Sequence, residues 1–549
     1  MKTEKPSYVV PLLAGLLVLL PVLVWMLLWE KPREETAPAA TDARPPLSAA
    51  RPAATGDALA ADRQAVVEQF RAALQRRMEL PDARAKEAVL TFKSDEAYQK
   101  FLERAAKAGL RILGRVDELY TVRVGYDSLD DLIRDITDHA ADYGAVNANL
   151  IMRAPPVPGP EDRPAVNQVP FRDSMLAFLG AKGDTTVWGR GVMIAILDSG
   201  IAPDSTFSEG RVRYLDVGLG LTVGAGLDDG HGTAVAALAA GAAGDARGVA
   251  PSAGLLSIRV TGADGTSDVF TVAQAIIAAV DAGAKVINLS MGSYYDSSLL
   301  TRAIDYATER GSVIVAAAGN DQAAQLVWPA ADPRVISVGA IDALGQQVIF
   351  SNSGDQLKLT APGYGVDTAW LNGQRVSMDG TSASAPIVAG AIAALMSENP
   401  GLSAAQAALI LEQYASDGGA VGTDPAYGHG ILNLGWAMDR NDTARVDTAI
   451  ASQSYSEVEG TMELVVQNRS GRAMAGLELS VDAGGTNTQY PIPLLAPGAT
   501  YVVRASIDDS RVAVEGGMVV RTELKNPAGV EDQVPANNRR ASLITPPRD

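Results

Sequence analysis

The sequence predicts an α/β protein whose largest domain is a doubly wound parallel sheet, within residues 168–440. Short apolar runs alternate there with helices rich in small residues. The runs are continuously apolar, which is typical of strands buried on both faces of a parallel sheet. Alternating strands and helices of this kind form a layered α/β domain. The strands are predicted at 192–197, 255–260, 285–290, 312–318 and 335–340, and the helices at 269–283, 297–310, 382–398 and 403–414.

A smaller α+β domain is predicted at 87–153. Its pattern is strand, helix, strand, strand, helix, strand, which is the ferredoxin-like order. This order is common and has no function attached to it. The elements are predicted at 87–93, 95–108, 110–116, 118–124, 128–143 and 145–152.

The last part of the chain, 446–549, predicts a small antiparallel β-sandwich. Apolar residues alternate with polar ones at a period of two, which is the pattern of half-buried strands. Leu477, Leu479 and Val481 share one face, and Tyr501, Val503 and Ala505 share another. Gly-Gly and Pro-Gly turns separate the runs, as in sandwich domains.

Charge and composition exclude several function classes. The chain has 549 residues, with 46 Lys and Arg against 64 Asp and Glu, a net charge of −18. Nucleic-acid binding needs a basic face, so nucleic acid is not expected as a partner. Cysteine is absent, which excludes disulfides and thiolate chemistry. The three histidines, His139, His231 and His429, lie in different sequence contexts, so no metal site is expected.

A transmembrane helix is predicted at 8–29, after a short cytoplasmic segment at 1–7. The stretch carries no charge and is long enough to cross a bilayer. The alternative is a cleaved signal peptide, whose apolar core is usually shorter and is followed closely by a cleavage site. The nearest small-residue site, Ala37 to Ala39, lies well beyond the apolar run.

Positive charges flank this stretch almost equally on both sides, so they do not decide its orientation. The shortness of the N-terminal side favours that end inside the cell. We therefore expect a single-pass protein whose catalytic domain is extracytoplasmic, either periplasmic or extracellular. Residues 30–80 are predicted to be a tether rich in Ala, Pro and charge, followed by an amphipathic helix at 62–79.

Three short motifs in the α/β domain carry candidate catalytic residues. Asp198 follows a predicted buried strand, His231 lies between glycines at the start of a helix, and Ser382 begins an apolar helix. Singly, each is an ordinary turn or capping residue. Together, Ser, His and Asp on separate elements are the parts of a nucleophilic triad. Their order along the chain, Asp, His, Ser, is that of one known triad class.

The stretches around these residues resemble the subtilisin-like (subtilase) family. They are ILDSGI (196–201), DDGHGTAVA (228–236), GVAP (248–251), VINLSMGS (286–293), VAAAGND (315–321), FSNSG (350–354), APG (361–363), DGTSASAPIVAGAIAAL (379–395) and YGHGILN (427–433). The resemblance covers 168–440 and implies a serine endopeptidase that acts through an acyl-enzyme and needs no cofactor.

The resemblance also implies roles for individual residues. Ser382 is the nucleophile, His231 the general base, Asp198 its partner, and Asn320 the side-chain donor to the oxyanion. The implied walls of the substrate pocket are Ser290, Met291, Gly292, Ala317, Ala318 and Gly319, with residues 262–266 as the second edge. Protein or peptide substrates would add to these edges as a β-strand.

Two departures from the family pattern stand out. Ala237 occupies a position where the family usually has glycine, which affects helix packing and not chemistry. The segment 238–248 is short where many relatives have a calcium loop, and only Asp245 could be a ligand there. A calcium site needs six to eight oxygens, so we expect none.

Resemblance also suggests what the flanking domains are. Residues 87–153 resemble the inhibitory propeptide of the family, and NNRRAS (537–542) is similar to bacterial CARDB-type Ig-like modules. This resemblance implies that the protein is made as a zymogen and that its own propeptide-like domain is a partner of the protease. The proline-rich linker 154–167 joins that domain to the enzyme, and we expect self-cleavage between 150 and 168.

Two other readings of the sequence are open. One is a catalytically silent binding scaffold with a permanently docked propeptide-like domain, which the complete triad argues against. In the other, the C-terminal sandwich carries the function and the protease only processes it. Deleting residues 446–549 and measuring peptide cleavage distinguishes these interpretations.

Overall fold

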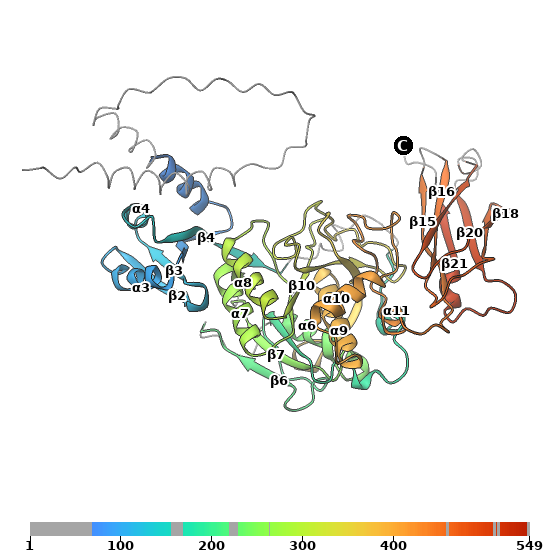
Figure 1. The fold of residues 1–549 in the computed structure, drawn as a ribbon, viewed down its shortest axis with the longest axis horizontal. Coiled ribbons are helices and arrows are strands. Elements are labelled where there is room, and N and C mark those ends of the chain that lie inside the picture. The colour runs from blue at the N-terminus through green and yellow to red at the C-terminus, as the bar shows by residue number, and fades with distance from the viewer. Residues whose placement is uncertain are drawn as a thin grey trace, which may run out of the picture. The chain divides into compact units, whose positions relative to one another are not determined.

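The computed structural model of the chain describes residues 68–154, 168–218, 229–262, 264–456, 460–508, 512 and 517–545. The chain divides into two compact units, drawn together in Figure 1. Unit 1 ends at Ile151 and includes Ser297–Leu299, and unit 2 contains the remainder. The predicted membrane span at 8–29 lies outside the described residues. Among the helices that are described, none combines the length and apolar character needed to cross a bilayer.

Unit 1 contains a four-stranded antiparallel sheet with two helices. Its elements are β1 (Ala83–Phe92), α3 (Asp95–Arg104), β2 (Leu110–Val116), β3 (Thr121–Tyr126), α4 (Leu129–Asp138) and β4 (Tyr143–Arg153). These strands lie in the order β2-β3-β1-β4. Residues 68–78 form a helix, within the predicted 62–79, of which residues 62–67 lie outside the described part.

The two helices of this sheet end earlier than the periodicity predicts. Helix α3 stops at Arg104 and not at 108, because Leu110 turns back to donate its N–H to the carbonyl of Ala105. Gly109, with φ of +77°, makes this turn possible, since L side chains rarely adopt that conformation. Helix α4 stops at Asp138, where His139 is the C-cap.

The predicted parallel sheet of unit 2 is confirmed. It has seven strands in the order β12-β11-β10-β9-β5-β7-β6. They are β5 (Met193–Asp198), β6 (Val212–Leu215), β7 (Gly254–Arg259), β9 (Val286–Leu289), β10 (Val313–Ala317), β11 (Ile336–Ile341) and β12 (Leu359–Pro362). The sequence analysis missed β6 and β12. Both lie at sheet edges, and β6 carries exposed polar residues in place of a continuous apolar run.

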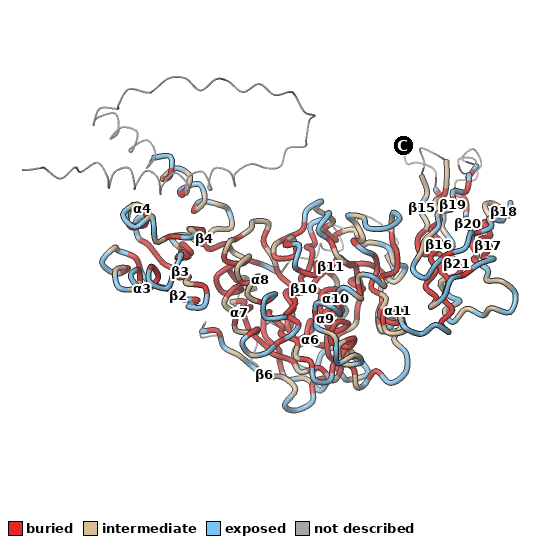
Figure 2. The backbone as a smooth tube through the Cα atoms, viewed as in Figure 1, coloured by how far each residue is buried: buried red, intermediate tan, exposed pale blue. Residues whose placement is uncertain are grey.

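Helices pack on this sheet and on one another, and Figure 2 shows the buried interior that results. They are α6 (His231–Ala240), α7 (Val269–Asp281), α8 (Ser298–Glu309), α9 (Thr381–Glu398) and α10 (Ala404–Gln413). Helix α9 lies against β5, β9, β10 and β11, and it also contacts α6 and α10. Residues 381–395 of α9 are all buried, which explains why that helix is apolar on every side.

The order of the strands brings the candidate site residues to one edge of the sheet. Strands β9 and β7 flank β5 on opposite sides, so the chain reverses its direction of winding at β5. Asp198 ends β5, Ser290 follows β9, and Asn320 lies three residues after β10. Ligands of open α/β sheets bind at such switch points, beyond the carboxyl ends of the strands.

The C-terminal part of unit 2 is a two-sheet antiparallel sandwich. One sheet has the order β15-β16-β19 and the other β18-β17-β20-β21. The strands are β15 (Thr448–Ser456), β16 (Thr461–Asn468), β17 (Glu478–Ala483), β18 (Thr486–Pro491), β19 (Thr500–Ser506), β20 (Met518–Lys525) and β21 (Arg539–Ile544). Leu479 and Val481 belong to the core between the sheets. Tyr501 is 39% exposed, because it lies near the start of β19, beyond this core.

Candidate catalytic site

Asp198 and His231 meet where β5 ends and α6 begins. The Nδ1 atom of His231 lies 2.7 Å from Oδ1 of Asp198, and the same oxygen accepts the N–H of Ser199 at 2.7 Å. The carboxylate of Asp198 is 2% exposed and the imidazole of His231 is 19% exposed. A buried carboxylate held this way fixes both the orientation and the tautomer of the imidazole, so that its other nitrogen points away.

Glycine is required where these two elements touch. A Cβ atom on Gly232 would lie 2.4 Å from the carbonyl oxygen of Gly200, and one on Gly230 would lie 2.5 Å from the indole of Trp370. Both distances are below those that real Cβ atoms show. Gly232 therefore allows α6 to start directly against the end of β5, and Gly230 leaves room for the indole of Trp370.

Two opposing effects set the pKa of His231. Burial acts to lower the pKa of the imidazole, while the charge and hydrogen bond of Asp198, with the charge of Asp229, act to raise it. The net result is a pKa above the ordinary histidine value. Asp229, which the sequence analysis did not single out, also accepts the backbone N–H of His231 at 3.0 Å.

Ser382 occupies the first turn of α9. The helix begins after Gly380, whose φ of +118° L side chains rarely adopt. The hydroxyl of Ser382 lies 3.4 Å from the carbonyl oxygen of Ser290, to which it donates. Within the described residues it makes no hydrogen bond to His231. Such bonds are often long in unliganded hydrolases and shorten when substrate binds.

Asn320 is held in place by the residue before Ser382. Its Oδ1 accepts both the backbone N–H and the hydroxyl of Thr381, each at 2.9 Å. This pair of bonds assigns the amide orientation and directs Nδ2 to the other side of the side chain. Asn320 is 1% exposed. Thr381 is a positioning residue that the sequence analysis missed, and the only signal for it was its place next to Ser382.

The predicted pocket walls lie on two neighbouring strand ends. Ser290 and Met291 follow β9, and Ala318 follows β10; all three are buried. Gly319 has a φ of +114°, and a Cβ there would lie 2.2 Å from Nδ2 of Asn352. Asn352 belongs to the FSNSG stretch and donates to the carbonyl of Ala318 at 3.3 Å.

The backbone of Gly292, in one of the predicted pocket walls, already pairs with another segment of this chain. Arg153 donates its N–H to the carbonyl of Gly292 at 3.1 Å and accepts the N–H of Gly292 at 2.9 Å. These two bonds form an antiparallel bridge. In the predicted second edge, 262–266, the N–H of Gly262 donates to the carbonyl of Thr266 at 2.8 Å, which closes a turn.

An arginine neutralises the acidic residues near the short 238–248 segment. Asp204, whose side chain is 0% exposed, lies 3.0 Å from Nη1 of Arg375, and Nε of Arg375 lies 3.1 Å from Asp245. Asp245, the one residue considered as a calcium ligand, is thus in an ion pair. Among the described residues, no group of three or more His, Cys, Asp or Glu side chains could hold a metal ion.

Comparison with known proteins agrees with this geometry. The model of the subtilase family matches residues 189–430. Subtilisin BL of Lederbergia lenta is 36% identical over 255 residues, which cover 45% of this chain and 90% of that protein. The chain belongs to the subtilase family. This subtilase is therefore a serine endopeptidase of the subtilisin type.

Other relatives extend the comparison. An alkaline protease of Shouchella clausii is 36% identical over 45% of this chain and 63% of that protein. The solved structure of an epidermin leader peptide processing serine protease from Staphylococcus aureus is 21% identical, with a TM-score of 0.54. It covers 64% of this chain and 97% of that one, and at this identity it supports the fold alone.

Calcium chelation should leave this subtilase active and folded, because Arg375 supplies the positive charge beside Asp204. Replacing Arg375 with Met should lower the free energy of unfolding by about 3 kcal/mol, since it leaves a buried carboxylate unpaired. Asp204→Asn in the same chain should recover part of that loss. Thermal and urea unfolding with and without EDTA measure both effects. A large loss of stability in EDTA that calcium reverses would contradict the prediction.

Proposed function

We propose that this subtilase is a membrane-tethered endopeptidase, made as a zymogen, whose triad is Asp198, His231 and Ser382. The observation that carries the proposal is the 2.7 Å contact between Asp198 and His231. Ser382, at the start of α9, donates to the carbonyl of Ser290, which follows β9, the strand next to β5. The chemistry that these groups support is acyl transfer.

The reaction proceeds in two stages. Ser382 Oγ attacks the scissile carbonyl while the imidazole of His231 takes its proton. The protonated imidazole then donates that proton to the leaving amine, and an acyl-enzyme remains. Water repeats the sequence in the second stage, and Asp198 stabilises the imidazolium in both. The raised pKa of His231 agrees with a base whose charged form is stabilised by a neighbouring carboxylate.

Negative charge develops on the carbonyl oxygen during each attack. Nδ2 of Asn320 and the backbone N–H of Ser382, at the N-terminus of α9, are the proposed donors to it. Donors fixed before the reaction need no reorganisation when the charge forms, which makes them effective. The two bonds from Thr381 keep the Asn320 amide in that orientation.

Peptide segments are the proposed substrates. The backbone of Gly292 already forms an antiparallel bridge with Arg153, and this bridge supports a role for the edge in binding extended segments. Main-chain hydrogen bonds of this kind give affinity without regard to side chains. Residues 317–319 form the neighbouring wall, and they are small and buried. Broad protein substrates fit such a groove better than one small molecule does.

A fluorophosphonate probe should label Ser382, and Ser382→Ala should reduce casein cleavage to near background. Ser384, two residues further along α9, is the matched control. Ser384 is fully buried, and its hydroxyl is shared between the carbonyls of Ala361 and Pro362. Ser384→Ala should retain labelling at Ser382. Undiminished cleavage by Ser382→Ala would exclude that residue as the nucleophile.

The rate should fall in acid because His231 must be neutral to act as a base. An unperturbed histidine titrates near ~6.5, and the raised pKa of His231 moves the midpoint above that value. Asp198→Asn removes the charge that raises the pKa, so the midpoint should shift to lower pH. It should also reduce kcat on the order of 10⁴-fold, as in other triad enzymes. The check is kcat/KM against pH for both proteins; a rate that is flat down to pH 4 argues against His231.

Residues 87–153 are proposed to be an inhibitory propeptide-like domain. The contact that supports this is the pairing of Arg153 with Gly292, because the residue that ends β4 uses the edge a substrate would need. The C-terminal sandwich is proposed to be an Ig-like, CARDB-like module. The span at 8–29 is proposed to anchor the chain, with the catalytic domain in the periplasm or outside the cell.

Self-cleavage between 150 and 168 should separate the span from the protease, because the span lies on the N-terminal side of the cut. N-terminal sequencing of the mature enzyme should find a start in this window, and Ser382→Ala should lack it. Cell fractionation should find residue 1 with the membrane and the mature enzyme in the extracytoplasmic fraction. An active enzyme that still carries residue 1 would overturn the release model and leave the catalytic assignment standing.

A further inference from the structure

A cavity between the sandwich and the α/β part of unit 2 has mostly positive side chains among the charged residues of its wall. Its volume is about 390 Å³, enough for roughly a dozen waters at ~30 Å³ each. The ionisable side chains in its wall are Lys182, Arg445, Arg469, Arg540 and one carboxylate, Asp447. This excess of cations is notable in a chain whose net charge is −18.

The carboxylate is already neutralised by one of these arginines. Arg445 is 3% exposed and donates to Oδ2 of Asp447 at 2.5 Å and to Asp439 at 2.5 Å. The other oxygen of Asp447 accepts Nδ2 of Asn537 at 2.9 Å. Asp447 therefore compensates Arg445, and Lys182 lies 3.8 Å from Asp439. Among the described residues, Arg469 and Arg540 form no ion pair.

Arg469 is the group with unused donors. It is 7% exposed, and it donates its Nε–H to Oε1 of Gln467 at 2.9 Å. Within the described part of the chain, its two terminal amino groups have no protein acceptor. Burial lowers the pKa of Arg469 to about 10; Asp447 opposes this effect, and Arg540 and Arg445 add to it. An arginine in such surroundings is stabilised by an anion that accepts from both amino groups.

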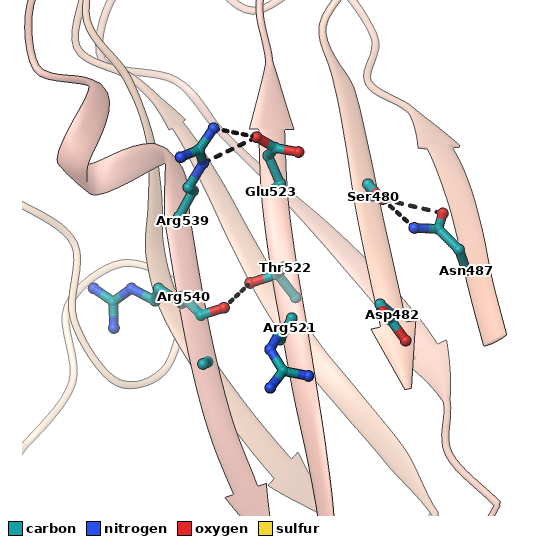
Figure 3. Close-up of a pocket in the computed structure, with 9 residues that line it drawn as sticks. Ser480, Asp482, Asn487, Arg521, Thr522, Glu523, Arg539 and Arg540 are labelled. Carbon is teal, nitrogen blue, oxygen red and sulfur yellow. Dashed lines mark hydrogen bonds and ion pairs between the residues drawn. The ribbon is translucent and has the colours of Figure 1, made fainter. Parts of the chain in front are cut away.

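Arg540 adds positive charge from the last strand of the sandwich. It donates Nε–H to the carbonyl of Ile450 and Nη2–H to that of Ala451, which fixes its guanidinium. Figure 3 shows this guanidinium directed away from the polar groove over β17 and β20, where Arg521 and Asp482 lie. On the opposite wall of the cavity, Lys182, Ser416 and Asn433 belong to the α/β part.

We propose that this cavity binds a small multivalent oxyanion, with Arg469 as its principal ligand and Arg540 and Lys182 as supporting charges. The planar guanidinium of Arg469 suits a carboxylate or a phosphate equally, because both offer paired oxygens. A bound anion would contact both the sandwich and the α/β part and would therefore link them. The site is independent of the catalytic triad and of the proposed processing.

The test is calorimetric titration of the full chain, in a Ser382→Ala background that prevents self-digestion. Inorganic phosphate and citrate are titrated separately, in chloride buffers of matched ionic strength. At least one should bind saturably at one site with a Kd of about 1 mM or less. Binding of phosphate alone identifies a tetrahedral oxyanion, and binding of citrate alone a carboxylate. No saturable binding of either overturns the proposal.

Arg469→Gln should weaken that binding about ten- to hundredfold, the loss typical of hydrogen bonds to a charged group. Arg521→Gln is the matched control, because it removes the same charge from an exposed arginine in the other sheet of the sandwich. It should bind as the parent does. Equal binding by Arg469→Gln, or an equal loss in Arg521→Gln, contradicts the assignment. If Arg469→Gln does not fold, Arg469→Lys keeps the charge without the planar fork and should still weaken binding several-fold.

Discussion

The contact between Asp198 and His231 depends on how closely the start of α6 approaches the end of β5. Gly232 permits this approach, since a side chain there would collide with the backbone of Gly200. The approach fixes the imidazole against a buried carboxylate, 2.7 Å away, and so raises the pKa of His231. Helix α9 must then begin beside the same edge, and its buried residues pack on β5, β9, β10 and β11. The geometry of the site therefore depends on the same packing that forms the core.

The parts of the fold that the sequence predicted are those with an uninterrupted pattern. The inner strands β5, β7, β9, β10 and β11 were all found to within two residues, because burial on both faces leaves a continuous apolar run. The edge strands β6 and β12 were missed for different reasons: β6 carries exposed residues, whereas β12 is buried but is only four residues long and contains Thr360 and Pro362. Helix ends were placed too late in unit 1, since the turn at Gly109 depends on a positive φ and a local hydrogen bond, which apolar periodicity does not report.

In the site, motif residues were easier to predict than the residues that hold them. Asp198, His231, Asn320 and Ser382 were named from short patterns, and the structure brings the first two into contact. Thr381 and Asp229 were not named, although each bonds directly to one of those four. Their roles arise from backbone geometry between separate elements, which spacing along the chain does not report. The arginine cavity was missed for the same reason, because its residues come from both parts of unit 2.

Gly292 is subject to two separate requirements. A Cβ atom there would lie 2.4 Å from Cγ2 of Val327, so no larger residue fits. The N–H and carbonyl of Gly292 are both bonded to Arg153, although a substrate strand would need the same two groups. A covalently joined segment competes at an effective concentration in the millimolar range, whereas a substrate must supply its own. Arg153 must therefore leave this edge before a substrate strand can pair fully with it.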